Sequence, residues 1–367
     1  MRVAIPKEIT LGEQRVALVP SLVPELIQLG CTISLEKEAG LGAHYSDKDY
    51  KDVQFYDDSL SLYQDADIIL KIQSPFEEEI AHFKRNSVVI GFLFPTRYPE
   101  RVSALCKHFI TSFAMESIPR ISRAQTMDAL SSQATASGYK ATLIAANISN
   151  RFFPMLTTAA GTIRPANVLV IGAGVAGLQV IATARRLGAI VKAYDIRSAA
   201  REQVESLGAK MINIDVKADA SGGYARELTT EEQQQQKNVL FEAFSKADVV
   251  ISTALIPGKP APKIINREMV ELMAPGSVIV DIAAEAGGNC ELTEPDKFIH
   301  HHDVTIYGPV NLPSMMARDA SNMYAKNIVN FLKLMIKDGK INLDWQDEIL
   351  AKSVLTHKGE IKQAEAT

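Results

Sequence analysis

Short apolar runs alternate with longer segments of helical spacing along almost the whole chain. Five runs rich in β-branched residues are predicted strands, and they occupy residues 66–72, 87–93, 167–171, 247–253 and 276–282. Between several of them lie segments with apolar residues three or four positions apart, such as Ser21 to Leu29, which Gly30 ends. Near-continuous apolar strands separated by helices are typical of parallel sheets covered on both faces. The pattern predicts an α/β fold.

Two long helices are predicted at Gln125 to Ile148 and at Ala320 to Ile336. We interpret them as the segments through which the chain leaves a first domain and returns to it. The prediction is two Rossmann-like, doubly wound parallel-sheet domains joined by long helices. The N-terminal domain would be discontinuous (residues 1–130 plus 316–367), and a nucleotide-binding domain with the connecting helix would occupy 131–315. A length of 367 residues favours two domains; alternatively, both helices are core elements of one large domain.

The composition narrows the class of protein. Hydrophobic residues make up 47% of the chain and charged residues 22%, which excludes a disordered chain. The net charge of -4 gives no indication of nucleic-acid binding. Three widely spaced cysteines, Cys31, Cys106 and Cys290, suit free thiols in a reducing compartment. Because neither a signal peptide nor a membrane helix is recognisable, we expect a cytoplasmic protein.

A dinucleotide fingerprint follows the predicted strand at 167–171. Gly172, Gly174 and Gly177 form a GxGxxG motif between this strand and a helical segment. The first glycine permits a tight turn, the second admits a pyrophosphate, and the third lets the helix pack on the strand. Asp195 ends the next strand, where a carboxylate binds ribose hydroxyls and repels a 2′-phosphate, so NAD(H) is favoured over NADP(H). Arg197 weakens that preference, and a glycine-rich turn without a ligand is the alternative.

The densest polar cluster lies at the start of the first long helix. Its members are Arg120, Arg123, Gln125, Asp128, Ser131 and Ser132. If that helix joins two domains, the cluster lies at the mouth of the cleft between them. The side chains of Gln, Asp and Ser offer the mixed donors and acceptors that a nicotinamide carboxamide needs. Helix capping with surface ion pairs is the simpler interpretation.

Three loops are further candidates for parts of the cofactor site. Residues 218–229 contain Gly222, Gly223 and Tyr224, a composition expected of a lid or of an ordinary surface loop. The segments 253–265 and 281–291 follow predicted strands, and loops at strand carboxyl ends commonly border the cofactor.

Histidines do not complete a catalytic site in the sequence. None lies within the fingerprint or the polar cluster. The triplet His300 to His302 offers metal ligands, but adjacent side chains do not easily share one tetrahedral site, so we expect no metal.

Together, five segments resemble the NAD(H)-binding component of proton-translocating nicotinamide nucleotide transhydrogenase. They are MRVAIPKEITLGEQRVALVP, RISRAQTMDALSS, VIGAGVAGLQVIATARRLGA, STALIPGKPAPK and GSVIVDIAAEAGGNCE. The resemblance covers nearly the whole chain and is nearest to the separate soluble alpha subunit of some bacteria. It implies hydride transfer from bound NADH to NADP+ on a partner subunit, coupled to proton movement by a membrane subunit. It also implies a homodimer, held at the inner membrane through those partners.

The resemblance assigns roles to residues of this chain. Arg120, Gln125, Asp128 and Ser131 would surround the nicotinamide. Tyr224 would lie with Gly223 on a mobile loop that closes over the cofactor. Asp195, Ile196 and Arg197 would meet the adenosine ribose, and Val175 and Leu255 would lie along the cofactor.

Alanine dehydrogenase is the nearest related family, with similar IPKE and RVA segments. Gln73 stands at the place of its substrate-binding lysine, Phe94 at that of its catalytic histidine and Glu285 at that of a functional aspartate, whereas Arg15 is retained. Hydride transfer between two nicotinamide rings requires no general acid or base, only alignment of the rings. The departures therefore favour a transhydrogenase. An alanine-dehydrogenase-type enzyme and a non-catalytic NAD-binding module are the alternatives.

Overall fold

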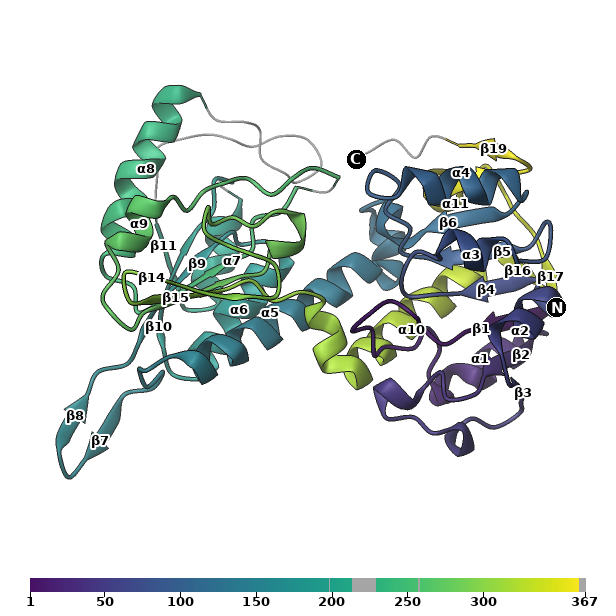
Figure 1. The fold of residues 1–367 in the computed structure, drawn as a ribbon, viewed down its shortest axis with the longest axis horizontal. Coiled ribbons are helices and arrows are strands. Elements are labelled where there is room, and N and C mark those ends of the chain that lie inside the picture. Colours follow the sequence, from purple (N-terminus) through teal and green to yellow (C-terminus); the bar gives the residue numbers. More distant parts are fainter. Residues whose placement is uncertain (198, 213–228, 257, 363–367) are drawn as a thin grey trace. The chain divides into compact units, whose positions relative to one another are not determined.

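The chain forms two compact units, each built on one large sheet (Figure 1). The computed structural model describes residues 1–197, 199–212, 229–256 and 258–362. Unit 1 comprises Met1–Gln133 and Pro313–Thr367, and unit 2 comprises Ala134–Leu312. Both sheets are mostly parallel, which confirms the predicted α/β class with Rossmann-like sheets.

The sheet of unit 1 has the strand order β19-β18-β6-β5-β4-β1-β2-β3. Its parallel part, β3-β2-β1-β4-β5-β6, has the strand order of dinucleotide-binding folds. The edge strands β18 and β19 run antiparallel, so the sheet is mixed rather than purely parallel. Its strands are β1 Arg2–Ile5, β2 Thr32–Glu36, β3 Val53–Tyr56, β4 Ile68–Leu70, β5 Val88–Gly91, β6 Thr111–Ala114, β18 Val354–His357 and β19 Glu360–Ile361. A separate ladder pairs β16 Ile336–Lys337 with β17 Lys340–Ile341.

Helices cover the sheet of unit 1. They are α1 Val23–Gln28, α2 Ser59–Asp65, α3 Glu77–Ile80, α4 Pro99–Lys107, α10 Ala317–Met335 and α11 Glu348–Ser353. Helix α10 buries Tyr324, Ile328 and Phe331, whose spacing of four and three residues places them on one face. This face packs in the same core as strands β1 and β5, which explains the helical period in the sequence.

The sheet of unit 2 has the order β11-β10-β9-β12-β13-β15-β14, and its edge strand β14 pairs antiparallel with β15. Val168 and Val170 of β9 pack in one core with helix α6, and Leu169 and Ile171 pack in a second core with α8. Both faces of β9 are thus buried, which accounts for its unbroken apolar sequence. The strands are β9 Asn167–Ile171, β10 Ile190–Tyr194, β11 Lys210–Met211, β12 Val249–Ser252, β13 Val278–Asp281, β14 Phe298–His301 and β15 Val304–Tyr307. The helices are α6 Val175–Arg186, α7 Ala200–Ser206, α8 Thr230–Phe244 and α9 Arg267–Glu271.

The first long helix begins later than predicted. Residues Ser122–Met127 form a separate 3-10 helix, η5, and α5 spans Ala129–Ile148. The side chain of Asp128 accepts a hydrogen bond from the Ser131 backbone N–H, so Asp128 caps α5 and sets its start. The chain passes from unit 1 to unit 2 within this helix.

Two hairpins belong to unit 2. Strands β7 Leu156–Thr158 and β8 Gly161–Ile163 form a hairpin that projects from this unit (Figure 1). Strands β14 and β15 are joined by a turn of two residues, His302 and Asp303, with φ of 47° and 57°. These values describe the left-handed turn that matches the twist of a hairpin, a conformation usually given to Asn-Gly.

None of the described helices is both long enough and apolar enough to cross a membrane.

Candidate dinucleotide-binding site

The glycine turn after β9 has the geometry of a pyrophosphate cradle. Gly172 adopts φ of 91°, and a Cβ added at Gly177 would lie 1.9 Å from the Gly172 carbonyl oxygen. These two positions therefore require glycine for the fold itself. A Cβ added at Gly174 would meet, among the described residues, only the Arg197 guanidinium at 4.0 Å. Gly174 thus leaves space beside the backbone, and no side chain of the described residues caps the helix that starts there. Backbone amide groups at the start of a helix suit a phosphate.

Asp195 follows β10 and is bound by its neighbours. Arg197 donates from its backbone N–H and Nε to Oδ1, at 2.8 and 2.9 Å, and from a terminal nitrogen to Oδ2 at 2.7 Å. The Ala173 N–H donates to Oδ2 at 2.7 Å. Burial alone raises the pKa of Asp195, but the hydrogen bonds and charge of Arg197 outweigh it, and the pKa lies below its usual value. The carboxylate is thus ionised and holds the glycine turn in place.

Polar groups tie the following loops to the glycine turn. Thr253, directly after β12, donates from its hydroxyl to the Gly172 carbonyl at 2.9 Å. The Asn289 side chain accepts from the Ala254 N–H and donates to the Ala254 carbonyl. Asp281, at the end of β13, is fully buried and accepts hydrogen bonds from Ser252, Thr293 and two backbone amides. These contacts fix the carboxyl edge of the sheet.

Two apolar side chains stand exposed at this edge. Val175 is 42% exposed at the start of α6, and Leu255 is 46% exposed in the loop after β12. Ile196 is half-buried and packs against the core that contains α8. The unit therefore offers apolar surface beside the cradle, as a cofactor site needs. Gly223 and Tyr224, the predicted lid residues, lie outside the described residues.

The predicted nicotinamide cluster lies in unit 1, on the segment after β6. The carboxylate of Asp128 accepts from the Ser131 N–H at 2.8 Å and from the Ser131 hydroxyl at 2.6 Å. Arg123 forms a two-point ion pair with Asp347, at 2.7 and 2.8 Å. Arg120 and Gln125 are exposed. The structure thus brings Asp128 and Ser131 together in a helix cap and assigns Arg123 to an ion pair, while Gln125 stays available.

Arg15 does not present a free guanidinium. It donates to both carboxylate oxygens of Glu13, at 2.8 and 2.6 Å, and to the side-chain oxygen of Gln133 at 2.7 Å. Gln73 also donates to Glu13, at 2.8 Å. Burial alone raises the pKa of Glu13, but the charge and hydrogen bonds of Arg15 outweigh it and lower the pKa to about 2. Arg15 therefore has a permanent internal counter-ion.

Other buried charges line the carboxyl edge of unit 1. Lys71 is 1% exposed, pairs with Glu79 at 2.7 Å and lies 3.5 Å from Glu8. Glu116 accepts hydrogen bonds from the backbone amides of Leu93 and Phe94. Burial raises the pKa of both Glu8 and Glu116 to about 7. None of these buried charges was singled out from the sequence as functional.

Comparison with known proteins decides the family. Residues 4–137 match the family described as "Alanine dehydrogenase/PNT, N-terminal domain", and residues 141–364 match "Alanine dehydrogenase/PNT, C-terminal domain". The chain belongs to the alanine dehydrogenase/PNT family. Together the two matches account for nearly all of its sequence, as the resemblance predicted.

The chain is more similar to transhydrogenase subunits than to alanine dehydrogenases of this family. It is 46% identical to the first part of the NAD(P) transhydrogenase alpha subunit of Rhodospirillum rubrum, over 98% of this chain and 97% of that protein. A transhydrogenase crystal structure from Sinorhizobium meliloti has a TM-score of 0.90 at 43% identity, covering 98% of this chain and 100% of that one. Identity to an alanine dehydrogenase of Staphylococcus haemolyticus is 27%, over 98% of this chain and 94% of that protein. The identities confirm a transhydrogenase alpha subunit; alanine dehydrogenases are more distant.

Sequence reasoning missed the residues that position the site. Asp281, the last residue of β13, and Asn289 lie in the segment 281–291 that the strand pattern had already selected, but neither was assigned a role. Asp281 could have been found as the one acidic residue that ends an otherwise apolar strand. Glu285 likewise accepts a hydrogen bond from the Asn311 backbone, a contact that no sequence pattern indicates.

Proposed function

We propose that this subunit binds NADH and transfers its hydride to NADP+ held by a separate transhydrogenase subunit. The observation that carries the proposal is the open backbone at Gly174, within a Rossmann turn whose other glycines are fixed by sterics. Whole-chain similarity to transhydrogenase alpha subunits supports the reaction type.

The residues of this chain bind and orient rather than exchange protons. Gly172, Gly174 and Gly177 admit the pyrophosphate, and Asp195 and Arg197 meet the adenosine ribose beside Ile196. Val175 and Leu255 provide apolar contacts along the cofactor. Arg120, Gln125, Asp128 and Ser131 hold the carboxamide of the nicotinamide, and Tyr224 with Gly223 closes over it. When bound, the dihydronicotinamide ring of NADH supplies the hydride. The rate of transfer therefore depends on how this ring is aligned with the nicotinamide ring of NADP+.

Amino-acid chemistry is the less favoured alternative. A substrate carboxylate needs an available cation, and the guanidinium of Arg15 is already bound by Glu13 and Gln133. Gln73 cannot replace a lysine charge, and Phe94 cannot donate a proton. The contacts of Arg15 and the residue types at positions 73 and 94 therefore argue against a pyruvate site.

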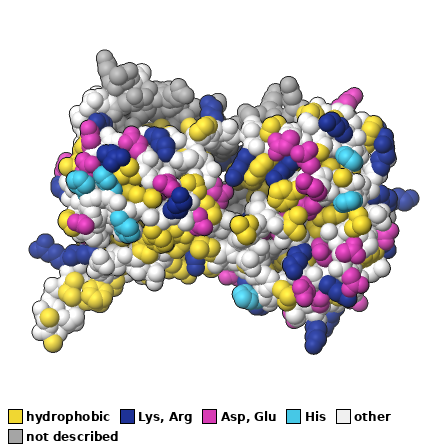
Figure 2. Space-filling model, viewed as in Figure 1, with side chains coloured by type: hydrophobic (Ala, Val, Ile, Leu, Met, Phe, Trp, Pro, Cys, Tyr) yellow, Lys and Arg dark blue, Asp and Glu magenta, His cyan; other side chains and the backbone are white. Residues whose placement is uncertain are grey.

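The proposal includes partners. A membrane subunit would couple the transfer to proton movement, so this subunit would lie in the cytoplasm at the inner membrane. A second copy would form a homodimer, for which the projecting β7–β8 hairpin and the exposed apolar side chains just before it provide a surface. Phe152 and Met155, just before β7, are 55% and 63% exposed, and Figure 2 shows hydrophobic side chains on this projection.

Two cuvettes test the reaction. The purified subunit and NADH are mixed with a transhydrogenase NADP-binding subunit loaded with NADP+, and nucleotide absorbance is followed. The second cuvette contains pyruvate and ammonium instead of that subunit. Transfer in the first cuvette alone supports the proposal. Oxidation in the second would establish a dehydrogenase, and NADH binding without transfer in either would indicate a binding module.

Gln125→Ala tests the nicotinamide cluster. Gln125 is exposed, so we expect an intact fold and a loss of about tenfold in hydride transfer. Gln28→Ala, at an exposed position of α1, is the matched control. For Asp128, the Asn variant keeps the helix cap and removes the charge, whereas Ala removes both. Unchanged transfer in Gln125→Ala and Asp128→Asn would overturn the assignment of this cluster.

A further inference from the structure

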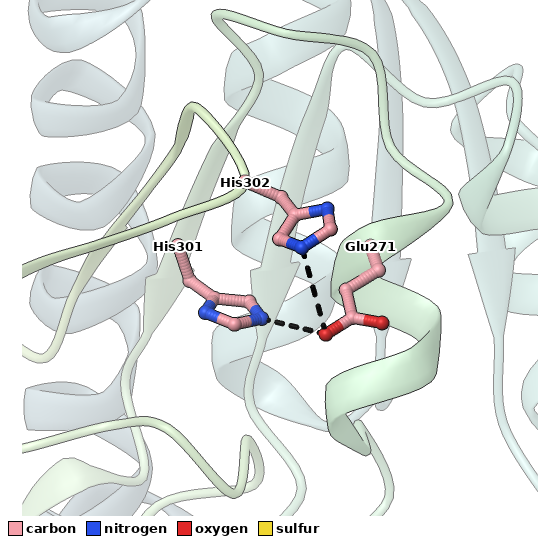
Figure 3. Close-up of side chains that lie close together, drawn as sticks. All are labelled: Glu271, His301 and His302. Carbon is pink, nitrogen blue, oxygen red and sulfur yellow. Dashed lines mark hydrogen bonds and ion pairs between the residues drawn. The ribbon is translucent and has the colours of Figure 1, made fainter.

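A second group of ligand-type side chains lies on unit 2, at the turn between β14 and β15. The Nε2 atoms of His301 and His302 both face the same oxygen of Glu271, at 2.8 and 3.9 Å (Figure 3). The ligand atoms of the three residues all lie within 4.8 Å of one another. Glu271 is the last residue of helix α9, so the group joins this helix to the hairpin.

The backbone explains how adjacent histidines converge. The sequence disfavours a shared metal site because adjacent side chains do not easily share one tetrahedral site. In a regular strand, successive side chains would indeed point to opposite faces. His301 ends β14, but His302 is the first residue of the turn and has left-handed backbone geometry. This conformation turns the His302 ring toward the same side as His301, as Figure 3 shows. The geometry therefore differs from the sequence-based expectation.

We propose that Glu271, His301 and His302 bind a divalent transition-metal ion of the zinc class. Two imidazole nitrogens and a carboxylate oxygen form a ligand set that Zn²⁺ takes in proteins, with the fourth position left to water. With bonds of about 2.0–2.1 Å, tetrahedral ligand atoms lie roughly 3.3 Å apart. The two observed distances to the Glu271 oxygen bracket this spacing. Small movements of these side chains, of which Glu271 and His302 are exposed and His301 is half-buried, thus complete the site.

The location assigns the ion a structural role. Strand β15 begins directly after the turn and runs parallel to β13, and the Asp303 carbonyl accepts from the Gly276 N–H just before β13. The group thus lies at the amino ends of these strands, whereas the glycine turn lies at the carboxyl end of β9. An ion here links α9 to the hairpin and stabilises the folded unit without touching the cofactor.

A cation from helix α9 also faces the group. Arg267, one helical turn before Glu271, lies 3.5 Å from both ring nitrogens of His301. Its positive charge opposes a bound cation, so its removal should tighten binding. This gives a variant whose expected change has the opposite sign from loss of a ligand.

Calorimetric titration of the tag-free subunit with Zn²⁺ tests the site. We expect one equivalent to bind, with affinity falling about tenfold or more in His301→Gln, His302→Gln and Glu271→Gln. His300→Gln is the matched control, because His300 contacts the cross-strand Thr305 instead. Arg267→Gln should bind more tightly than the wild type. Zinc should raise the melting temperature of the wild type and of His300→Gln, but not that of the three ligand variants.

A spectroscopic readout needs no variant. Co²⁺ in the wild-type subunit should give the visible absorption of a tetrahedral site, and Zn²⁺ should displace it. No binding of either ion by the wild type would overturn the proposal. Wild-type affinity in all three ligand variants would overturn it equally, and NADH binding serves as the check that each variant is folded.

Discussion

Arg197 encloses the carboxylate of Asp195, donating three hydrogen bonds to its two oxygens. With the Ala173 amide, the carboxylate accepts four hydrogen bonds, about the number that its lone pairs allow. A ribose hydroxyl can therefore bind Asp195 only after a donor moves. The pair is also electrically neutral, so repulsion of a 2′-phosphate by Asp195 depends on where Arg197 lies when the cofactor binds.

Asp195→Asn tests this relationship. The substitution releases the Arg197 guanidinium from its counter-ion, and we expect the preference for NADH over NADPH to fall roughly tenfold to a hundredfold. Fluorescence titration with each nucleotide measures the change. Asp248→Asn is the control, because Asp248 precedes β12 at the opposite end of the strands. An unchanged preference would show that Asp195 does not select the cofactor.

Gly174→Ala and Gly177→Ala should separate binding from folding. Alanine fits at Gly174, where φ is -75°, so we expect an unchanged melting temperature and an NADH affinity about tenfold weaker. Alanine at Gly177 would clash with the Gly172 carbonyl, so stability should fall by about 1–3 kcal/mol as well. Thermal melts and NADH titrations of both variants measure the two effects. If Gly174→Ala bound NADH as tightly as the wild type, the assignment of the glycine turn as the pyrophosphate site would be wrong.

Stability should decline as the pH rises from about 4.5 to 7. Burial raises the pKa of Glu116 from 4.5 to about 7, so in this interval the folded state keeps a proton that the unfolded chain has lost. The contribution is on the order of 3 kcal/mol once the pH exceeds both pKa values, at 1.36 kcal/mol per pKa unit. Glu8 has the same sign, so Glu116→Gln should flatten only some of the decline.

Urea unfolding at pH 5, 6, 7 and 8 measures the decline, with exposed Glu78→Gln on α3 as the control. Identical pH profiles for Glu116→Gln and the wild type would show that Glu116 ionises normally.

The β7–β8 hairpin and the residues just before it should form the interface between two copies of the chain. Replacing Phe152 and Met155 together by serine removes two exposed apolar side chains, each worth roughly 1.5–3 kcal/mol when buried. We expect the dimer to dissociate at a protein concentration more than about tenfold higher than for the wild type. Sedimentation equilibrium measures this, with Leu60→Ser on α2 as the control for an exposed apolar residue elsewhere. If the wild type were monomeric, the proposal that this hairpin forms a dimer interface would be wrong.

The strands and helices were predictable because burial imposes a clear period on the sequence. Val168 to Ile171 alternate between two cores, and Tyr324, Ile328 and Phe331 share one helix face. The start of α5 was predicted too early, since a single cap at Asp128 decides it and the apolar period continues through η5. The antiparallel pairing of β18 with β6 joins residues far apart in the sequence, which local pattern does not encode. The β14–β15 hairpin is local, but its turn contains His302 and Asp303 rather than the Asn-Gly that usually marks such a turn.

The candidate site was only partly predictable. Glycine positions follow from motif spacing, and the structure gives each a steric reason at Gly172 and Gly177. Arg15 is neutralised by an ion pair with Glu13, and Arg123 by an ion pair with Asp347. The second pair joins residues far apart in the sequence. The sequence identified the residue types at these places but could not show which charges were already neutralised.

The backbone conformation of the turn at His302 and Asp303 lowers the stability of the fold, and this matters for engineering. Both residues adopt positive φ, where L-residues with a Cβ lose roughly 1–2 kcal/mol each and Asn-Gly is preferred. A stability-driven redesign would therefore select Asn-Gly here and gain thermal tolerance. The same exchange would delete one imidazole of the group at Glu271. A library screened for melting temperature in a chelating buffer would discard this histidine, and one screened with zinc present would retain it.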